Sequence, residues 1–297
     1  MRVAKERFRK DGLVLPFGHP RLGFDYPNPT IFRGTDIWPI SDTDSPLGGW
    51  PMDEVSSTPW EASEDLYGRF FSYLRGVMTG FLRQIATRDM HFRLFNTNVT
   101  TLENLLTGTY DRIETSNISD PHNLGTPRTL GCLFPLLRPL SYNKHATIIT
   151  LYVDAVMDEV PSSNTEREVQ ESYGLALQRL RNAGIDIVAP GVNRTSAEYN
   201  RVWDKRGFLM DTEPIFQRFL ARIDMRSIQA RLNLTMKEYN TIVDPWPTRL
   251  KLRPDQPGAQ EEFARALSSP FTGVERYVEW KWWGRGSRLF YPRERRG

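Results

Sequence analysis

The chain has 297 residues, of which 39% are hydrophobic and 25% are charged. This composition is typical of a globular protein and excludes a disordered or fibrous one. A chain of this length buries roughly 75% of its extended surface on folding, so it can form one large domain or two small ones. Its 39 basic and 36 acidic residues give a net charge of +3, which is too small to predict nucleic-acid binding by the whole surface.

The first 60 residues predict an extended and turn-rich segment. They contain eight of the 21 prolines, and proline disfavours helix because it lacks a backbone donor. Aromatic residues make the segment too apolar for a free arm, and these are Phe17, Phe24, Tyr26, Phe32, Trp38 and Trp50. We therefore expect residues 1–60 to form an ordered strap that packs on a domain of residues 61–297.

Neither a targeting segment nor a metal site is predicted. The first residues, MRVAKERFRKDG, lack the apolar stretch of a signal peptide, and no run approaches the roughly 18 apolar residues of a membrane span. The single cysteine, Cys132, lies in an apolar run, and no Cys/His spacing fits zinc. We expect a cytoplasmic protein with no membrane partner and no metal.

Residues 63–87 predict a core-facing helix, because apolar residues recur at three- and four-residue spacing. The members of this stripe are Leu66, Phe70, Leu74, Val77, Met78, Phe81, Leu82 and Ile85. Gly76 and Gly80 stand four residues apart, which in a soluble helix favours close packing over a dimer motif.

A strand and a short helix are expected next. Apolar and polar residues alternate over residues 90–96 (MHFRLFN), which is the pattern of a strand. Thr100 and Glu103 form a capping box for a short helix over residues 101–106.

Residues 110–156 predict a strand, a polar loop, a helix and a second strand. The first strand covers residues 110–118, and the helix begins with Thr126 as N-cap and Pro127 at its first position. Residues 146–156 are almost continuously apolar, which suits a strand covered on both faces. Strands joined by such a helix pair in parallel through a right-handed crossover, so we expect an α/β fold with an open parallel sheet.

The second half of the chain predicts mostly helices, most of them in a helical insertion at about 157–245, and one more between the last two strands. The predicted helices are 165–183, 196–205, 214–232 and 258–267. The predicted strands are 248–252 and 275–283.

The basic C-terminal tail, residues 284–297, favours a solvated end over a patch for an anionic partner. Trp280, Trp282 and Trp283 precede this tail and could stack on nucleic-acid bases. Aromatic residues in a strand more often pack in the core or at a sheet edge. Nucleic-acid binding through the C-terminus therefore stays open as an alternative.

Several separated blocks resemble one known family. They are PFGHPRLGFDYPNP (16–29), WPISDTDSPLGGW (38–50), EDLYGRFFSYLR (64–75), YDRIETSNISD (110–120) and ERYVEW (275–280). On these blocks the chain is similar to an uncharacterised fungal family related to the dynein axonemal assembly factor 3 proteins, some of which carry a MYND zinc finger. The resemblance implies a partial Rossmann-like sheet, similar to the later part of a class I S-adenosylmethionine-dependent methyltransferase.

That resemblance also implies a cofactor loop that is not found in this sequence. In methyltransferases of this class, a glycine-rich loop follows the first strand and an acid follows the next. The nearest glycines, Gly18 and Gly23, lie among prolines and follow no recognisable strand. We therefore expect this chain to correspond to the later part of a longer protein of the family. It would be either a shortened paralogue or a truncated gene model. No cofactor is expected, with S-adenosylmethionine as the alternative.

Polar residues follow two of the predicted strands and form the candidate cofactor-binding set. This set is Asn96, Asn98, Ser116, Asn117, Ser119 and Asp120. Asn96 and Asn98 stand, by the resemblance, where methyltransferases place an acid that binds the adenine amine. The other four follow the next strand, where an open parallel sheet presents groups to a ligand.

Asp120 and His122 are the candidate catalytic residues, because two loop residues at i and i+2 can direct an acid and a base into one cleft. The favoured alternative is that Asn117 and Asp120 are turn and capping residues that bind the nearby backbone. The remaining histidines, His19, His91 and His145, are expected to be structural.

Three functions stay open. The preferred function is a non-catalytic, methyltransferase-like binding or assembly module with a protein partner, as the relation to an assembly factor implies. The second is a functional S-adenosylmethionine-dependent methyltransferase. The third is an RNA-associated protein that uses the tryptophan-rich and basic C-terminus.

Overall fold

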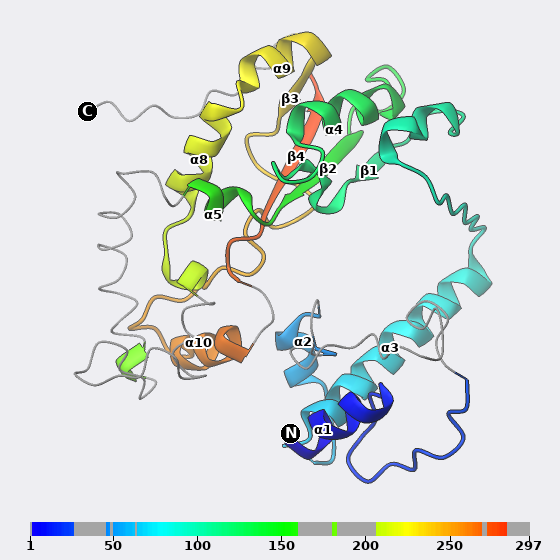
Figure 1. Cartoon of the computed structure of the whole chain (residues 1–297), viewed down its shortest axis with the longest axis vertical. Helices are drawn as coiled ribbons and strands as arrows, with labels where there is room; N and C mark the ends of the chain where they lie inside the picture. Colours follow the sequence, from blue (N-terminus) through cyan, green and yellow to red (C-terminus); the bar gives the residue numbers. More distant parts are fainter. Residues whose placement is uncertain are drawn as a thin grey trace. The chain divides into compact units, whose positions relative to one another are not determined.

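The computed structural model describes residues 2–26, 46–47, 50–62, 64–159, 180–182, 206–268 and 272–283. The chain divides into two compact units (Figure 1). One unit spans Met1–Leu94 with Ser268–Pro270, and the other spans Phe95–Leu267 and Phe271–Gly297. The helix predicted over residues 63–87 thus belongs to the first unit, together with the proline-rich segment.

Among its described residues, the first unit contains three helices, α1 (Arg2–Asp11), α2 (Met52–Ser57) and α3 (Leu66–Thr87). Residues 1–60 are therefore not extended throughout. Asp65 caps α3, because its carboxylate accepts a hydrogen bond from the Gly68 backbone N–H at 3.0 Å.

Part of the first 60 residues packs on the first half of α3. Leu47, Val55 and Phe70 form a buried cluster, with Val14 and Trp50 against it. Figure 1 shows α1 and α2 beside the first turns of α3, while its last turns extend beyond them. Residues 27–45, the centre of the predicted strap, lie outside the described residues.

Residues 90–96 do not form the predicted strand. Every residue from Met90 to Asn96 is exposed, including Phe92 at 61% and Leu94 at 95%, so neither side of this stretch is covered, and a strand needs partners for its backbone groups. The helix expected at residues 101–106 is the 3-10 helix η1 (Val99–Asn104), and its cap is Asn98 rather than Thr100.

A four-stranded sheet forms the centre of the second unit, in the order β1-β2-β4-β3. Its strands are β1 (Arg112–Glu114), β2 (Thr147–Tyr152), β3 (Leu234–Met236) and β4 (Arg276–Trp282). β1 and β2 pair in parallel, as predicted, with Ile113 opposite Ile148.

The other two strand pairs are antiparallel. The sheet is therefore mixed, and the prediction of a wholly parallel sheet is wrong. The apolar pattern of β4 shows that the strand is buried but carries no information on its direction, which depends on where the preceding chain enters the sheet. The fold is mixed α/β with helices flanking an open sheet, and its likeness to a methyltransferase sheet stays a prediction.

The connection between β1 and β2 contains the 3-10 turn η2 (Ser116–Ser119), the helix α4 (Thr126–Leu133) and the 3-10 turn η3 (Phe134–Leu136). The N-cap of α4 is Gly125, with Pro127 in its first turn. The Thr126 hydroxyl bonds the Ser119 carbonyl and the Tyr152 hydroxyl, so it does not cap the helix.

The other helices that the structure describes in this unit are α5 (Ala155–Glu159), η4 (Arg206–Leu209), α8 (Glu213–Arg222), α9 (Met225–Leu232) and α10 (Ala259–Ser268). The single helix predicted over residues 214–232 is broken between α8 and α9. Asp224 causes this break, because it adopts a left-handed conformation with φ of 46° and caps α9. The predicted helices 165–183 and 196–205 fall outside the described residues, except for residues 180–182, which are helical.

Two further predictions for this half need correction. The insertion at 157–245 is not wholly helical, because it includes β3. Residues 248–252 form no strand. The Lys251 and Leu252 N–H groups donate instead to the Glu262 carboxylate on α10, at 2.7 and 3.0 Å.

The core of the second unit lies between the sheet and helices α4, α5, α8 and α9. Tyr152, Phe216 and Phe219 pack edge to face at its centre. Trp280 is fully buried and donates to Thr150, and the Trp282 indole donates to the Arg138 carbonyl.

In the parts of the chain that the structure describes, no helix is long and apolar enough to cross a membrane.

Candidate functional site

The side chain of Asp120 lies at the carboxyl end of β2. This residue is fully buried, and its carboxylate accepts hydrogen bonds from the N–H groups of Val153 at 2.9 Å and Asp154 at 3.3 Å. Burial raises the pKa of Asp120, and the backbone donors oppose this effect only in part. Asp120 therefore joins the loop after β1 to the end of β2.

His122 lies in the same loop but pairs with a different acid. Its Nε2 lies 3.0 Å from Asp158 on α5, and its side chain is 69% exposed. The hydrogen bond that His122 donates to the Asp158 carboxylate raises the pKa of His122. Within the described residues no hydrogen bond joins Asp120 to His122, so the two predicted catalytic residues are brought near one another without forming an acid and base pair.

The other predicted binding residues separate into two groups. Ser116, Asn117 and Ser119 lie together in η2, beside Asp120. Ser119 is buried with its hydroxyl 3.4 Å from that of Thr115, and the Asn117 carbonyl accepts from Asn123. These contacts are all within the loop.

Asn96 and Asn98 form the second group, and no strand ends beside them. Both are exposed, and the Asn98 side chain accepts from the Thr100 N–H at 3.0 Å. Asn98 is therefore a helix cap.

A buried tyrosine closes the strand ends further. The Tyr152 hydroxyl lies 2.9 Å from the Thr126 hydroxyl, and complete burial raises the pKa of Tyr152 to about 12. Protein side chains thus occupy the edge where an open parallel sheet would present groups to a ligand.

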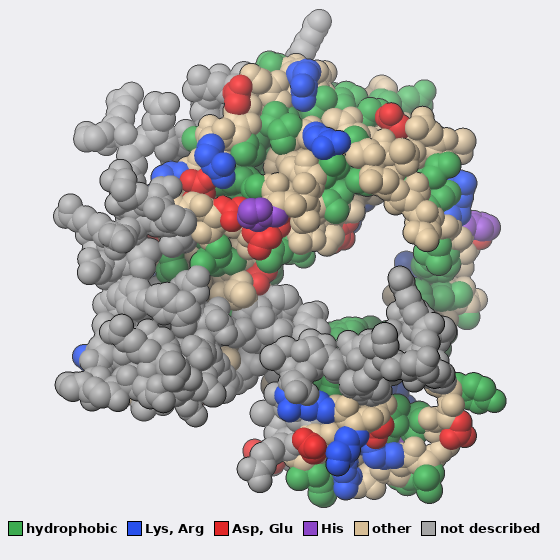
Figure 2. Space-filling model, viewed as in Figure 1, with side chains coloured by type: hydrophobic (Ala, Val, Ile, Leu, Met, Phe, Trp, Pro, Cys, Tyr) green, Lys and Arg blue, Asp and Glu red, His purple; other side chains and the backbone are tan. Residues whose placement is uncertain are grey.

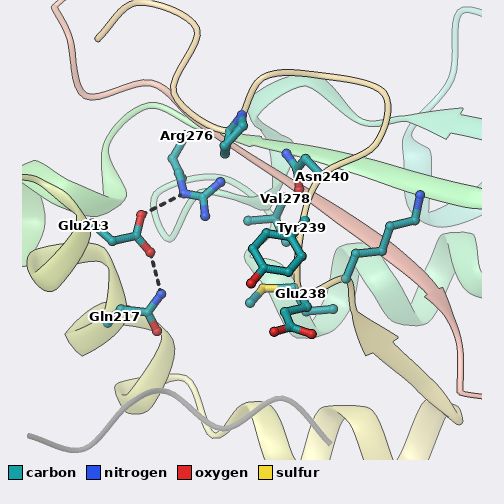
Figure 3. A pocket seen from close by; sticks show the side chains of 10 residues that line it. Glu213, Gln217, Glu238, Tyr239, Asn240, Arg276 and Val278 are labelled. Atoms are coloured by element: carbon teal, nitrogen blue, oxygen red, sulfur yellow. Dashed lines mark hydrogen bonds and ion pairs between the residues drawn. The ribbon is translucent and has the colours of Figure 1, made fainter. Parts of the chain in front are cut away.

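A pocket of about 300 Å³ lies elsewhere in the second unit, between α8 and the loop that follows β3 (Figure 3). It is lined by Glu213, Gln217, Met236, Lys237, Glu238, Tyr239, Asn240, Pro245, Arg276 and Val278. Figure 3 shows Glu213 and Gln217 entering from α8, and Tyr239 and Glu238 facing them from the loop. The volume is at the lower end of the roughly 300–1,000 Å³ typical of ligand pockets, which suits a group of side-chain size.

The inner part of the pocket is an ion pair with aromatic neighbours. Arg276 Nε lies 3.5 Å from Glu213 Oε2, and its guanidinium lies over the rings of Phe216 at 5.2 Å and Trp246 at 5.1 Å. Glu213 also accepts from Gln217 Nε2 and from the Trp246 indole, both at 2.7 Å. Burial lowers the pKa of Arg276, and the carboxylate of Glu213 opposes this shift.

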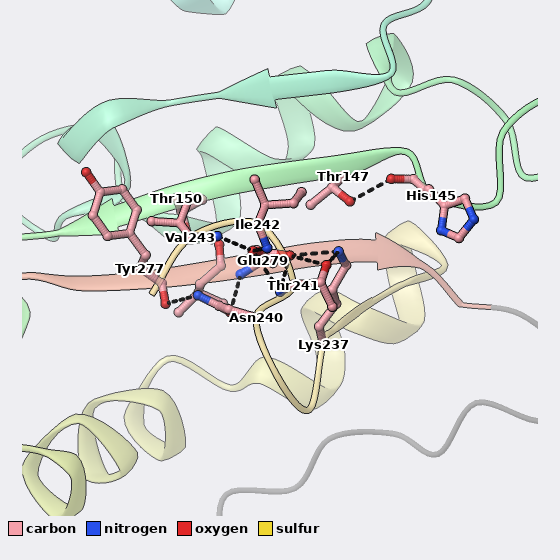
Figure 4. Close-up of polar contacts among 11 residues, drawn as sticks. His145, Thr147, Thr150, Lys237, Asn240, Thr241, Ile242, Val243, Tyr277 and Glu279 are labelled. Carbon is pink, nitrogen blue, oxygen red and sulfur yellow. Dashed lines mark hydrogen bonds and ion pairs between the residues drawn. The ribbon is translucent and has the colours of Figure 1, made fainter. Parts of the chain in front are cut away.

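The loop that carries Tyr239 is held by the buried carboxylate of Glu279 on β4 (Figure 4). Glu279 accepts from the N–H groups of Thr241, Ile242 and Val243 at 2.6 to 3.0 Å. It also pairs with Lys237 at 2.7 Å. These donors lower the pKa of Glu279 to about 2 in spite of its burial.

In the first unit, the second half of α3 has an exposed apolar face. The exposed fractions are 40% for Val77, 51% for Met78, 44% for Phe81, 64% for Leu82 and 38% for Ile85. The sequence predicted that the whole stripe faces a core, and this is wrong for its second half. We call these five residues the α3 apolar face.

All charged residues in the second half of α3 are basic. Arg75, Arg83 and Arg88 are exposed, and no acidic residue occurs between Leu66 and Arg88. Over the described surface in Figure 2, by contrast, basic and acidic side chains are interspersed, as expected for a net charge of +3.

Sequence reasoning missed both of these sites. Glu213 and Arg276 are 63 positions apart, and no motif links them. The stripe of α3 was visible in the sequence, but an apolar stripe does not show which of its turns has a neighbour. The arginines without acidic partners were the available signal.

Among the described residues, no group of three or more His, Cys, Asp or Glu side chains could hold a metal ion. Comparison of the chain with protein-family models, curated proteins and solved structures gives no match.

Proposed function

We propose that this chain is a non-catalytic binding module for assembly, and that it holds an acidic amphipathic helix of a partner protein on the α3 apolar face. One observation carries the proposal: five large apolar side chains, from 38% to 64% exposed, lie on consecutive turns of one helix. Contiguous exposed apolar surface of this kind marks interaction sites, because leaving it in water is unfavourable.

Charge selects the kind of partner. The second half of α3 carries Arg75, Arg83 and Arg88 and no acid; Arg75 lies at the edge of the α3 apolar face, and Arg83 lies on the other side of the helix. A second copy of α3 would place like charges opposite one another, whereas an acidic helix would pair with them. The mode is therefore a helix packed on a helix, with anchors at three- and four-residue spacing.

The strand-end edge supports a non-catalytic role. Asp120, the predicted acid, is occupied by the backbone donors of Val153 and Asp154, and His122 pairs with Asp158 on the surface. The resemblance to relatives of an assembly factor supports the same proposal.

The tryptophans considered for RNA binding favour a structural role. Trp280 is in the core, and the ring centroids of Trp282 and Phe134 lie 4.2 Å apart.

The test uses the full chain and two designed peptides. Both are amphipathic helices with leucine heptads, one with glutamate and one with lysine at the flanking positions. We expect fluorescence anisotropy to show binding of the acidic peptide only, weakened by salt. Phe81→Gln with Leu82→Gln should reduce the affinity at least tenfold.

Leu22→Gln is the matched control, because Leu22 is 94% exposed and lies outside α3. It should leave the affinity unchanged, and circular dichroism should show all variants folded. Equal binding of both peptides, unchanged binding by the double variant, or self-association that the double variant abolishes would each contradict the proposal.

A further inference from the structure

The pocket between α8 and the loop after β3 is a second candidate site, independent of the α3 apolar face. Every residue that lines it belongs to the second unit. Its chemistry can be worked out from which of its polar groups already have partners.

Both basic residues of the pocket are matched by carboxylates. Lys237 is 12% exposed and pairs with Glu279, and its Nζ also bonds the Thr241 hydroxyl at 2.8 Å. Arg276 pairs with Glu213, and two aromatic rings lie close to its guanidinium.

Two buried atoms of the lining residues form no hydrogen bond with the described residues, Gln217 Oε1 and Arg276 Nε, although Arg276 Nε lies 3.5 Å from the Glu213 carboxylate. The Gln217 amide nitrogen donates to Glu213. Its Oε1 is buried and has no donor among the described residues. The Glu238 carboxylate is exposed and forms no ion pair with a described residue. Tyr239 is 75% exposed, and Figure 3 shows its ring between Glu238 and the Arg276–Glu213 pair.

From this arrangement we infer that the pocket binds a cationic side chain, the guanidinium of arginine or the ammonium of lysine, from a protein segment. A cation would pair with the exposed carboxylate of Glu238, which forms no ion pair with a described residue. The Tyr239 ring offers a face for it, as aromatic rings do for Lys and Arg. An anion would meet Glu238 and Glu213 before it reached the buried Arg276.

The inference is tested by calorimetry on the full chain with N-acetyl-arginine amide and N-acetyl-lysine amide as probes, and with inorganic phosphate as the anionic probe. We expect at least one capped cation to bind, and phosphate not to bind. Glu238→Gln should weaken cation binding at least fivefold, and Tyr239→Leu should also weaken it.

Glu261→Gln is the matched control. It removes one exposed carboxylate on α10, outside the pocket, and it should change the affinity less than twofold. Absence of cation binding, equal affinity in Glu238→Gln and the parent chain, or phosphate binding would overturn the inference. Free arginine that binds tenfold more tightly than its capped form would overturn a protein segment as the source.

Discussion

At the residue scale, Glu279 is the side chain on which the loop beside the pocket depends. It is buried on β4, and three backbone N–H groups, one hydroxyl and the Lys237 ammonium donate to it. Removing one member of such a buried pair leaves the other without compensation. Glu279 therefore links the central strand to the residues that form one wall of the pocket.

Glu279→Gln should destabilise the chain by about 3 kcal/mol, because it leaves Lys237 without its carboxylate and places an amide among backbone donors. Urea unfolding measures this loss. Glu261→Gln, on the surface of α10, should change stability by less than about 0.5 kcal/mol. Equal stability of the two variants would show that the Glu279 contacts contribute nothing.

The contribution of Glu279 to stability should also depend on pH. Its folded pKa of about 2 lies below its ordinary value of 4.5, so the unfolded chain binds a proton first as the pH falls. The stabilisation is complete above pH 4.5 and is lost as the pH falls towards 2, with a slope of about 1.4 kcal/mol per pH unit. Stability measured from pH 6 to 3 should fall less steeply in Glu279→Gln than in the parent chain.

Asp120 and His122 should differ in their effect on stability. Asp120→Ala should cost about 2–3 kcal/mol, because the N–H groups of Val153 and Asp154 lose their acceptor. His122→Ala should leave the stability close to that of the parent chain, since its pair with Asp158 is exposed. Thermal unfolding of both variants checks this, and a large effect of His122→Ala would assign that pair a structural role.

At the element scale, α3 has two halves with different environments. Its first half is buried where Phe70 meets Leu47 and Val55. In its second half no heavy atom would lie within 4 Å of a Cβ added at Gly76 or Gly80. The close packing predicted from these glycines is therefore absent among the described residues.

Gly80→Ala should stabilise the chain by about 0.5–1 kcal/mol, because alanine restricts the unfolded chain and meets no neighbour in the helix. Denaturant unfolding measures the gain. Gly68→Ala is the contrasting variant, since its added Cβ would lie 2.3 Å from the Trp60 indole nitrogen. It should destabilise. A loss of stability in Gly80→Ala would instead indicate a close neighbour at that turn.

At the scale of the whole molecule, S-adenosylhomocysteine separates the binding module from the methyltransferase alternative. A ligand at 100 times its dissociation constant stabilises the folded state by roughly 2.7 kcal/mol, which raises the melting temperature of a chain of this size by at least about 4 °C. We expect no shift at micromolar concentration. A clear shift would favour the methyltransferase and contradict a non-catalytic role.

Local patterns in the sequence determined several elements of this protein. α3, α10, β2 and β4 follow from the spacing of apolar residues, and the parallel pairing of β1 with β2 follows from the helix that joins them. The turn and capping role of Asp120 was also foreseeable, because an aspartate after a strand commonly binds nearby backbone.

Tertiary structure alone decided the direction of β4, the failure of the expected strands at residues 90–96 and 248–252, and the position of the pocket. Each depends on neighbours that are distant in sequence: Glu262 takes the backbone donors of Lys251 and Leu252, and Glu213 meets Arg276 across 63 positions. Periodicity reports whether a face is apolar. Whether another element covers that face is a property of the folded chain, and the α3 apolar face differs from the buried half of the same helix for this reason.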